Sequence, residues 1–144
     1  MWAAGQSRQV QPSLPASGSD RPLRVLIADD HVGLRAMVAE ALRSNGYDVD
    51  EVGSGALALE VIRRGDHRVA IIDVRMPVMD GLAVATRVRT EGLACRVIVI
   101  SVVDDPETRR RVAEAGAAFH RKPFRLADRL ADVRDAGTVP QALP

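Results

Sequence analysis

Cysteine is almost absent from this sequence, which has a single one, Cys95, among its 144 residues. One thiol cannot form an intramolecular disulfide, so the disulfide-rich scaffolds typical of small secreted domains are excluded. Because Cys95 stands within an apolar run, we interpret it as a small hydrophobic residue of the core. This cysteine usage agrees with a reducing compartment, and we expect a cytoplasmic protein.

Aromatic residues and charge of one sign are scarce as well. Aromatic side chains make up only 3% of the sequence, which argues against a platform for stacking nucleic-acid bases. The formal net charge is +1, so bulk charge gives no reason to expect nucleic acids or membrane surfaces as direct partners. The basic run Arg109-Arg110-Arg111 is therefore interpreted as a solvated helix face. No apolar run is long enough to span a bilayer, and residues 1–21 lack the apolar centre of a signal peptide.

Apolar residues, in contrast, are plentiful. They form 47% of the chain, which is enough for one core, and the length suits one domain. Residues 1–21 are instead rich in Gln, Ser, Pro and Gly, and they cannot bury enough apolar surface to offset the entropy of ordering. We expect a disordered N-terminal tail over residues 1–21, a folded domain over residues 22–136 and a C-terminal tail over residues 137–144.

Within the folded part, short apolar runs alternate strictly with amphipathic stretches, which predicts strands alternating with helices. Continuous apolar strands separated by helices are typical of an α/β fold, in which helices cover both faces of a parallel sheet. The strand-like segments are Leu23–Ala28, Tyr47–Val52, Val69–Val74, Arg96–Ile100 and Ala117–Arg121. The helix-like segments are His31–Ser44, Ala56–Arg64, Leu82–Thr90, Pro106–Ala115 and Leu126–Ala136.

Polar side chains follow four of the five strand-like segments at their carboxyl ends: Asp29, Asp30, Asp73, Ser101 and Lys122. The carboxyl ends of parallel strands meet in one crevice, so we expect these groups to converge there. Clustered carboxylates repel one another, and without a counter-ion at least one pKa should rise. A hard divalent cation such as Mg²⁺ relieves that repulsion and also binds phosphoryl oxygens. The sequence therefore predicts a magnesium and phosphoryl site.

These polar groups stand in four longer motifs: Ile27-Ala28-Asp29-Asp30, Ile72-Asp73-Val74-Arg75-Met76-Pro77-Val78-Met79-Asp80-Gly81, Ile100-Ser101 and Phe119-His120-Arg121-Lys122-Pro123-Phe124. In these motifs the chain resembles the receiver domain of response regulators in two-component signalling. The resemblance covers about residues 23–136 and implies a (βα)₅ flavodoxin-like fold, a doubly wound sheet of five parallel strands in the order 2-1-3-4-5.

The resemblance implies a role for each matching residue. Asp73 is the expected phosphoacceptor. Ser101 and Lys122 are expected to contact the phosphoryl group, while Phe119 is the switch aromatic that turns inward when Ser101 moves. The Lys122–Pro123 peptide bond is expected to be cis. The expected Mg²⁺ ligands are Asp29, Asp30, Asp73 and the backbone carbonyl of Arg75.

The implied activity is acceptance of a phosphoryl group from a histidine kinase or phosphotransfer protein. The chain is then no enzyme acting on another molecule, but a Mg²⁺-dependent acceptor that loses its phosphoryl group slowly. The signal is expected to leave through the last two helices and the strand between them, to a downstream protein or a second copy.

Several residues depart from the common receiver pattern or have a simpler reading. Val102 follows Ser101 where a small residue is usual, and it is expected to narrow access to the phosphoryl group. His31 and His120 are interpreted as structural, because no metal-ligand spacing joins them. Asp29 or Asp30 could also serve as the N-cap of the helix that follows.

Three other classes of protein fit the sequence less well. A receiver-like interaction module without phosphorylation is disfavoured by the complete set of site residues. A phosphatase with an aspartyl nucleophile would need Asp at the third position of Asp73-Val74-Arg75. A dinucleotide-binding domain would need a Gly-x-Gly-x-x-Gly motif after the first strand, and the sequence has none there.

Overall fold

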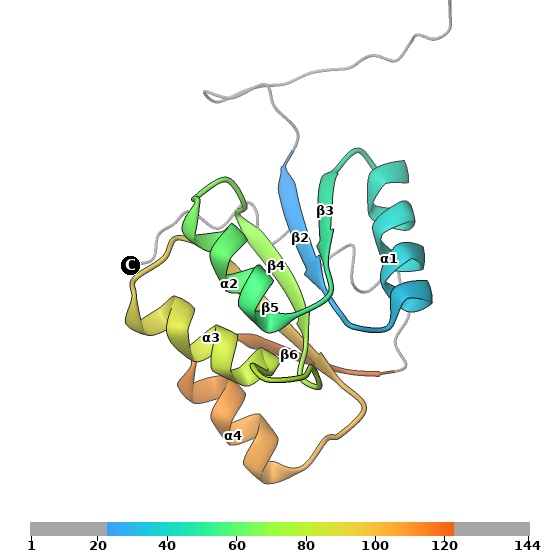
Figure 1. The fold of residues 1–144 in the computed structure, drawn as a ribbon. Helices are drawn as coiled ribbons and strands as arrows, with labels where there is room; N and C mark the ends of the chain where they lie inside the picture. Colours follow the sequence, from blue (N-terminus) through green and yellow to red (C-terminus); the bar gives the residue numbers. More distant parts are fainter. Residues whose placement is uncertain (1–22, 123–144) are drawn as a thin grey trace, which may run out of the picture.

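A computed structural model describes residues 23–122 of the chain, which form one parallel sheet flanked by helices (Figure 1). The sheet has five strands in the order β3-β2-β4-β5-β6, which is the predicted order 2-1-3-4-5 counted along the chain. The strands are β2 (Arg24–Ala28), β3 (Asp48–Val52), β4 (Val69–Asp73), β5 (Arg96–Ser101) and β6 (Ala118–Arg121). The helices are α1 (Val32–Ser44), α2 (Gly55–Arg63), α3 (Gly81–Thr90) and α4 (Pro106–Glu114). The predicted tails, the Lys122–Pro123 bond and the helix at 126–136 lie outside the described residues.

The sheet is central because its inner strands are apolar on both faces. All five residues of β4, Val-Ala-Ile-Ile-Asp, are buried, as expected for a parallel strand covered on both sides. One core cluster packs beneath α2, α3 and α4, and a second packs beneath α1, so the helices form two layers (Figure 1). The predicted α/β fold is therefore confirmed.

The starts of the helices are set by side-chain caps. Ser54 caps α2, and Asp80 and Asp105 cap α3 and α4. The prediction that Asp29 or Asp30 caps α1 was wrong, because the N-cap is His31, whose Nδ1 accepts a hydrogen bond from Leu34 N–H at 3.1 Å. This capping role gives His31 the structural function expected of it.

Cys95 behaves as the composition suggested. Its side chain is partly buried and packs against the core cluster on the α3 side of the sheet. Burial raises the pKa of the Cys95 thiol to about 12, so the reactive thiolate is scarce at neutral pH. None of the helices within residues 23–122 is long and apolar enough to cross a membrane.

The loop between β4 and α3 contains a strained turn at Val78. This residue has a φ of 69°, a region that β-branched residues avoid, and Met79 N–H donates to the carbonyl of Pro77 across it at 2.7 Å. The Val78 side chain is fully exposed, so no burial of apolar surface offsets the backbone strain.

Replacing Val78 by glycine should therefore stabilise the protein. Relief of the backbone strain, of order 1–3 kcal/mol, outweighs the extra entropy that glycine gives the unfolded chain, about 0.5–1 kcal/mol. We expect a net rise of about 1 kcal/mol in the free energy of unfolding, measured by urea denaturation. A lower stability of Val78→Gly would show that the turn is not strained.

Candidate functional site: an acidic crevice with one lysine

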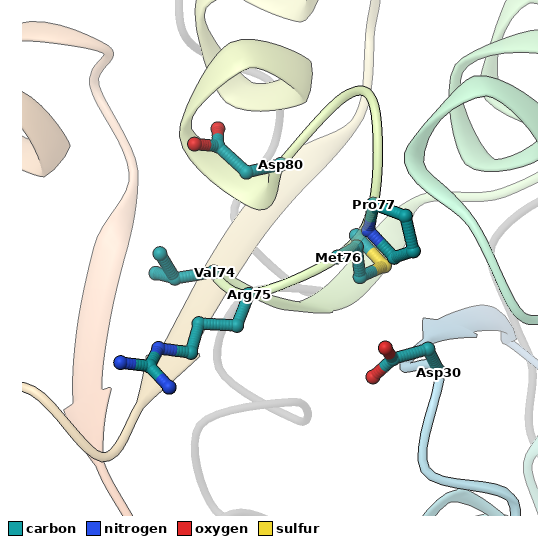
Figure 2. A pocket seen from close by; sticks show the side chains of 6 residues that line it. All are labelled: Asp30, Val74, Arg75, Met76, Pro77 and Asp80. Carbon is teal, nitrogen blue, oxygen red and sulfur yellow. The ribbon is translucent and has the colours of Figure 1, made fainter.

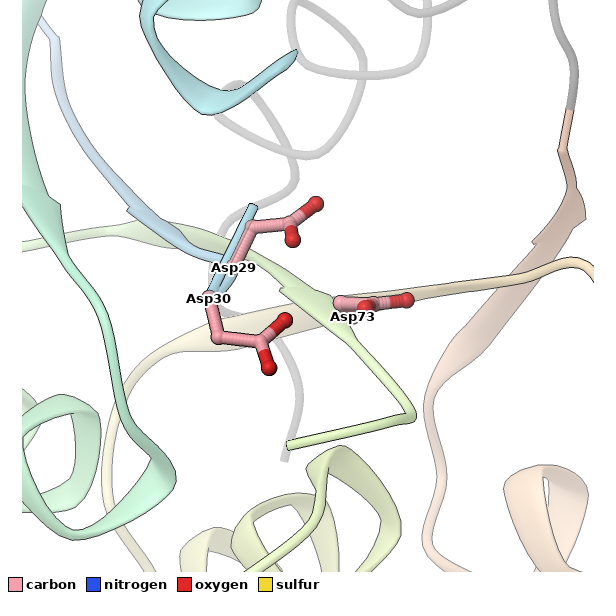
Figure 3. Close-up of side chains that lie close together, drawn as sticks. All are labelled: Asp29, Asp30 and Asp73. Carbon is pink, nitrogen blue, oxygen red and sulfur yellow. The ribbon is translucent and has the colours of Figure 1, made fainter. Parts of the chain in front are cut away.

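Three carboxylates meet at the carboxyl edge of the sheet, where the sequence predicted them. Asp29 and Asp30 directly follow β2, and Asp73 ends the neighbouring strand β4 (Figure 3). One ligand oxygen from each lies within 4.8 Å of the other two, and no other such group of metal-ligating side chains occurs within residues 23–122. Asp29 and Asp73 are only 2% and 7% exposed, whereas Asp30 faces solvent. His31 and His120 are not part of this cluster.

Lys122 supplies the positive charge of the crevice. It directly follows β6, yet its ammonium lies 3.2 Å from Asp29 Oδ2 and 3.3 Å from Asp73 Oδ1. The Lys122 side chain is 13% exposed, so these ion pairs are shielded from water. The predicted convergence of Lys122 on the aspartates is therefore confirmed in geometry.

The electrostatic environment of Asp73 reflects both its burial and its neighbours. Burial raises the pKa of Asp73 above its ordinary value, and the adjacent charges of Asp29 and Asp30 act in the same direction. Lys122 opposes this rise through its charge and a hydrogen bond. The net effect is a carboxylate that is costly to keep ionised without a further cation.

A hard divalent cation fits this donor set. Mg²⁺ prefers oxygen ligands and binds through one or two carboxylates while it keeps several waters. Asp30 and the loop after β4 also line an open pocket of about 450 Å³, which leaves room for those waters and a phosphoryl group (Figure 2). The Arg75 side chain points away from Asp30 in this pocket, so the side chain itself does not compete for the cation (Figure 2). The Arg75 carbonyl as a ligand stays a prediction.

The position of Asp73 depends on Gly81, at the start of α3. A Cβ atom at Gly81 would lie 2.4 Å from the Asp73 carbonyl oxygen, so any other residue would push the strand end away. Asp80 accepts a hydrogen bond from Ala83 N–H at 2.8 Å, which fixes the helix start at this point. The helix start at Asp80 and the missing side chain at Gly81 thus allow α3 to pack closely against the end of β4.

Ser101 and Phe119 lie on the α4 side of the crevice. Ser101 ends β5, is fully buried, and its Oγ accepts a hydrogen bond from Val103 N–H at 2.9 Å. The backbone carbonyl of Ser101 also accepts from Lys122 N–H at 2.7 Å, which ties β5 to the lysine. Phe119, in β6, is partly buried against the α2–α4 core cluster.

Sequence reasoning missed one contact in this region. The Arg109 guanidinium lies over the Phe119 ring, 4.9 Å from its centroid, although the Arg109–Arg111 run was interpreted as a solvated face. No sequence signal pairs these positions, because the arginine and the ring belong to different elements, α4 and β6.

The fold and this arrangement of groups define a receiver domain. The family described as the response regulator receiver domain matches residues 25–134. The chain belongs to this family, as the resemblance predicted.

Relatives with known names agree with this assignment. The chain is 33% identical over 114 residues to the response regulator MprA of Mycobacterium sp. (strain KMS), covering 78% of this chain and 50% of that protein. It is 42% identical over 98 residues to a probable transcriptional regulatory protein, NarL, of Mycobacterium tuberculosis, covering 67% and 45%. The solved receiver domain of the putative response regulator NarL from M. tuberculosis superposes with a TM-score of 0.75 at 36% identity, covering 81% and 97%. The chain spans about half the length of the curated relatives that it matches.

Proposed function

We propose that the chain accepts a phosphoryl group on Asp73 from a histidine kinase or phosphotransfer protein, with Mg²⁺, in the cytoplasm. The observation that carries the proposal is the buried Asp73 carboxylate, which lies 3.3 Å from the Lys122 ammonium in a cluster of three aspartates. The family match over residues 25–134 supports a receiver domain spanning about 22–136.

The chemistry is an in-line displacement at phosphorus. A carboxylate oxygen of Asp73 forms a bond to phosphorus while the bond to the donor histidine nitrogen breaks, and the freed imidazole takes up a proton. Lys122 neutralises negative charge on the transferred oxygens, and the Ser101 hydroxyl donates a hydrogen bond to one of them. Asp29, Asp30, Asp73 and the Arg75 carbonyl would hold Mg²⁺, which supplies further charge neutralisation when it is bound.

The product carries about two negative charges and three acceptor oxygens in a crevice built for a single carboxylate. Lys122 and Ser101 are drawn toward it, and Phe119 turns into the space that Ser101 leaves. The output surface comprises α4, β6 and residues 126–136, and it contacts a downstream protein or a second copy rather than nucleic acid. The phosphoryl group is lost slowly by hydrolysis, so the chain acts as a switch and not as an enzyme.

The direct test is phosphorylation of the purified chain. Incubation with acetyl phosphate and Mg²⁺ should add one phosphoryl group, detected by intact mass spectrometry, and EDTA should prevent it. Absence of the added mass with acetyl phosphate and with a phosphorylated histidine donor would favour a receiver-like interaction module instead.

The metal site has a separate test, in which Asp30 is replaced by asparagine. Even partners beyond the metal's direct ligands change affinity by 10–100-fold, so loss of this carboxylate should weaken Mg²⁺ binding by at least about tenfold. Phosphorylation should stop, and the metal-free fold should become more stable because one repelling charge is removed.

Asp66→Asn is the matched control, because Asp66 is an exposed loop residue outside the acidic cluster. Isothermal titration calorimetry with Mg²⁺ compares the two variants directly. Equal Mg²⁺ affinity in Asp30→Asn and Asp66→Asn would remove Asp30 from the metal site.

A further inference from the structure

The ring of Phe119 makes a cation–π contact with an arginine. The Arg109 guanidinium carbon lies 4.9 Å from the ring centroid, within the range in which a cation is attracted by the face of an aromatic ring. Phe119 is partly buried, with its inner side against the core cluster beneath α2, α3 and α4. Arg109 therefore covers part of the ring that the core leaves open.

Arg109 is held in place by Asp104. Its Nε donates to Asp104 Oδ1, and its Nη2 donates to Asp104 Oδ2 at 2.9 Å, which makes a two-pronged ion pair. Such planar pairs fix the orientation of the guanidinium as well as its position. Arg110, the next residue, makes its ion pairs with Glu107 and Glu114 on its own helix. Arg109 and Arg110 thus differ in environment, although they are adjacent and carry the same charge.

Asp104 belongs to the loop that follows Ser101, the last residue of β5. In this loop the Ser101 hydroxyl oxygen accepts a hydrogen bond from Val103 N–H at 2.9 Å. At the other end, Asp105 caps α4 by accepting from Thr108 N–H at 2.7 Å. Only two residues, Val102 and Val103, separate Ser101 from Asp104, so movement of the serine hydroxyl removes the Val103 hydrogen bond and disturbs the segment that carries Asp104.

We propose that the Asp104–Arg109 pair is a latch that holds Phe119 in its unphosphorylated position and so sets the resting equilibrium of the switch. The inference rests on the proposed function, in which Ser101 turns toward a phosphoryl group on Asp73. When it does, the Val103 hydrogen bond is broken, the Asp104 loop shifts, and Arg109 uncovers the ring. A contact present in only one of two states biases the equilibrium by its own free energy. Arg109 is thus a positioning residue, which acts through Phe119.

The first experiment examines the ring without any phosphoryl group. The chain has only two phenylalanines, Phe119 and Phe124, so fluorophenylalanine labelling gives two ¹⁹F NMR signals, assigned with a Phe124→Leu variant. Arg109→Gln should move the Phe119 signal toward its position in the beryllofluoride-treated protein. Asp104→Asn should move it in the same direction by less, because the arginine remains but loses part of its anchor.

The second experiment measures the switch itself. Beryllofluoride with Mg²⁺ mimics the phosphorylated aspartate, and half-saturation of the ¹⁹F response should need about 2- to 5-fold less beryllofluoride in Arg109→Gln. That factor is what a cation–π contact at an exposed site supplies. Arg110→Gln is the matched control, since it removes the same charge from the adjacent position of α4, and it should respond like the parent protein.

The outcomes separate the latch from the proposed function. If Arg109→Gln and Arg110→Gln agree in both the ¹⁹F spectrum without beryllofluoride and the half-saturating beryllofluoride concentration, the latch is overturned, while phosphorylation of Asp73 stands. A parent protein that gives no ¹⁹F response to beryllofluoride and no phosphoryl uptake contradicts the proposed function, and the latch fails with it. A shifted Phe119 signal and an easier response confined to Arg109→Gln and Asp104→Asn support the latch.

Discussion

Replacing Asp73 by asparagine should reduce phosphoryl incorporation from acetyl phosphate below detection, whereas the parent chain takes up one group. The amide of asparagine is not a nucleophile at phosphorus, and no other carboxylate in the crevice has the same setting. Asp29 is held by Lys122 and by His31 N–H, which donates to its Oδ1 at 2.9 Å, and Asp30 is exposed. Intact mass spectrometry measures the result, and Asp66→Asn should label like the parent. Equal labelling of Asp73→Asn would remove Asp73 as the acceptor.

The same substitution should stabilise the metal-free protein at neutral pH. The pKa of Asp73 is raised in the folded state, chiefly by burial, so ionised Asp73 favours the unfolded chain. The contribution of a group whose folded pKa is raised is fully present below its unfolded pKa and is lost as pH rises through the folded pKa. The gain from Asp73→Asn, measured by urea denaturation in EDTA, should therefore be absent in acid and grow toward neutral pH.

Replacing Lys122 by methionine should destabilise the metal-free protein by about 3 kcal/mol at neutral pH, because breaking a buried ion pair leaves uncompensated charge. The Lys122 ammonium is the cation placed between Asp29 and Asp73, at 3.2 and 3.3 Å, and all three side chains are largely buried. Methionine keeps most of the apolar part of the lysine side chain, so lost packing contributes little to the change in the free energy of unfolding.

Low pH and bound Mg²⁺ should each reduce the loss of stability caused by Lys122→Met. Without the lysine the pKa of Asp73 should rise further above its ordinary value, because Lys122 is the neighbour that lowers it. The stability difference between Lys122→Met and the parent should thus be smallest in acid and grow as pH rises toward neutral. Bound Mg²⁺ replaces part of the missing positive charge and should narrow the difference at neutral pH.

Arg121→Met is the control for Lys122→Met, since Arg121 is the preceding residue and is exposed. It should change the free energy of unfolding only slightly, because exposed charges contribute little. A pH-independent loss in Lys122→Met, insensitive to Mg²⁺, would assign the effect to packing and not to the carboxylates.

The crevice was predictable because the α/β fold converts chain order into spatial proximity. Once the apolar runs are recognised as parallel strands, the residues that follow them must meet at one edge of the sheet. This rule alone places three of the site residues at that edge, because each stands at the end of one such run: Asp30, Asp73 and Ser101. The convergence of Lys122 followed from the same rule.

The hydrogen bonds at the start of α1 could not be predicted from periodicity, because periodicity does not fix the first residue of a helix. The α1 cap was assigned to an aspartate because Asp is a common N-cap residue, yet the chain enters the helix one residue later and His31 takes that role. Asp29 instead accepts from His31 N–H at 2.9 Å and is left facing Lys122. A shift of one residue in a helix start thus decides which side chain caps and which one faces the crevice.

Local periodicity and the rules of strand connection were enough to predict the alternation of strands and helices along the chain, the parallel sheet and the groups that gather at its carboxyl edge. Which of the clustered carboxylates has the raised pKa, namely Asp73, and the contact of Arg109 with the Phe119 ring depend on tertiary packing. A pKa depends on how completely a group is removed from water and on charges from other strands, neither of which can be obtained from spacing along the chain. A cation–π contact depends similarly on ångström-scale packing between α4 and β6, which no spacing along the chain encodes.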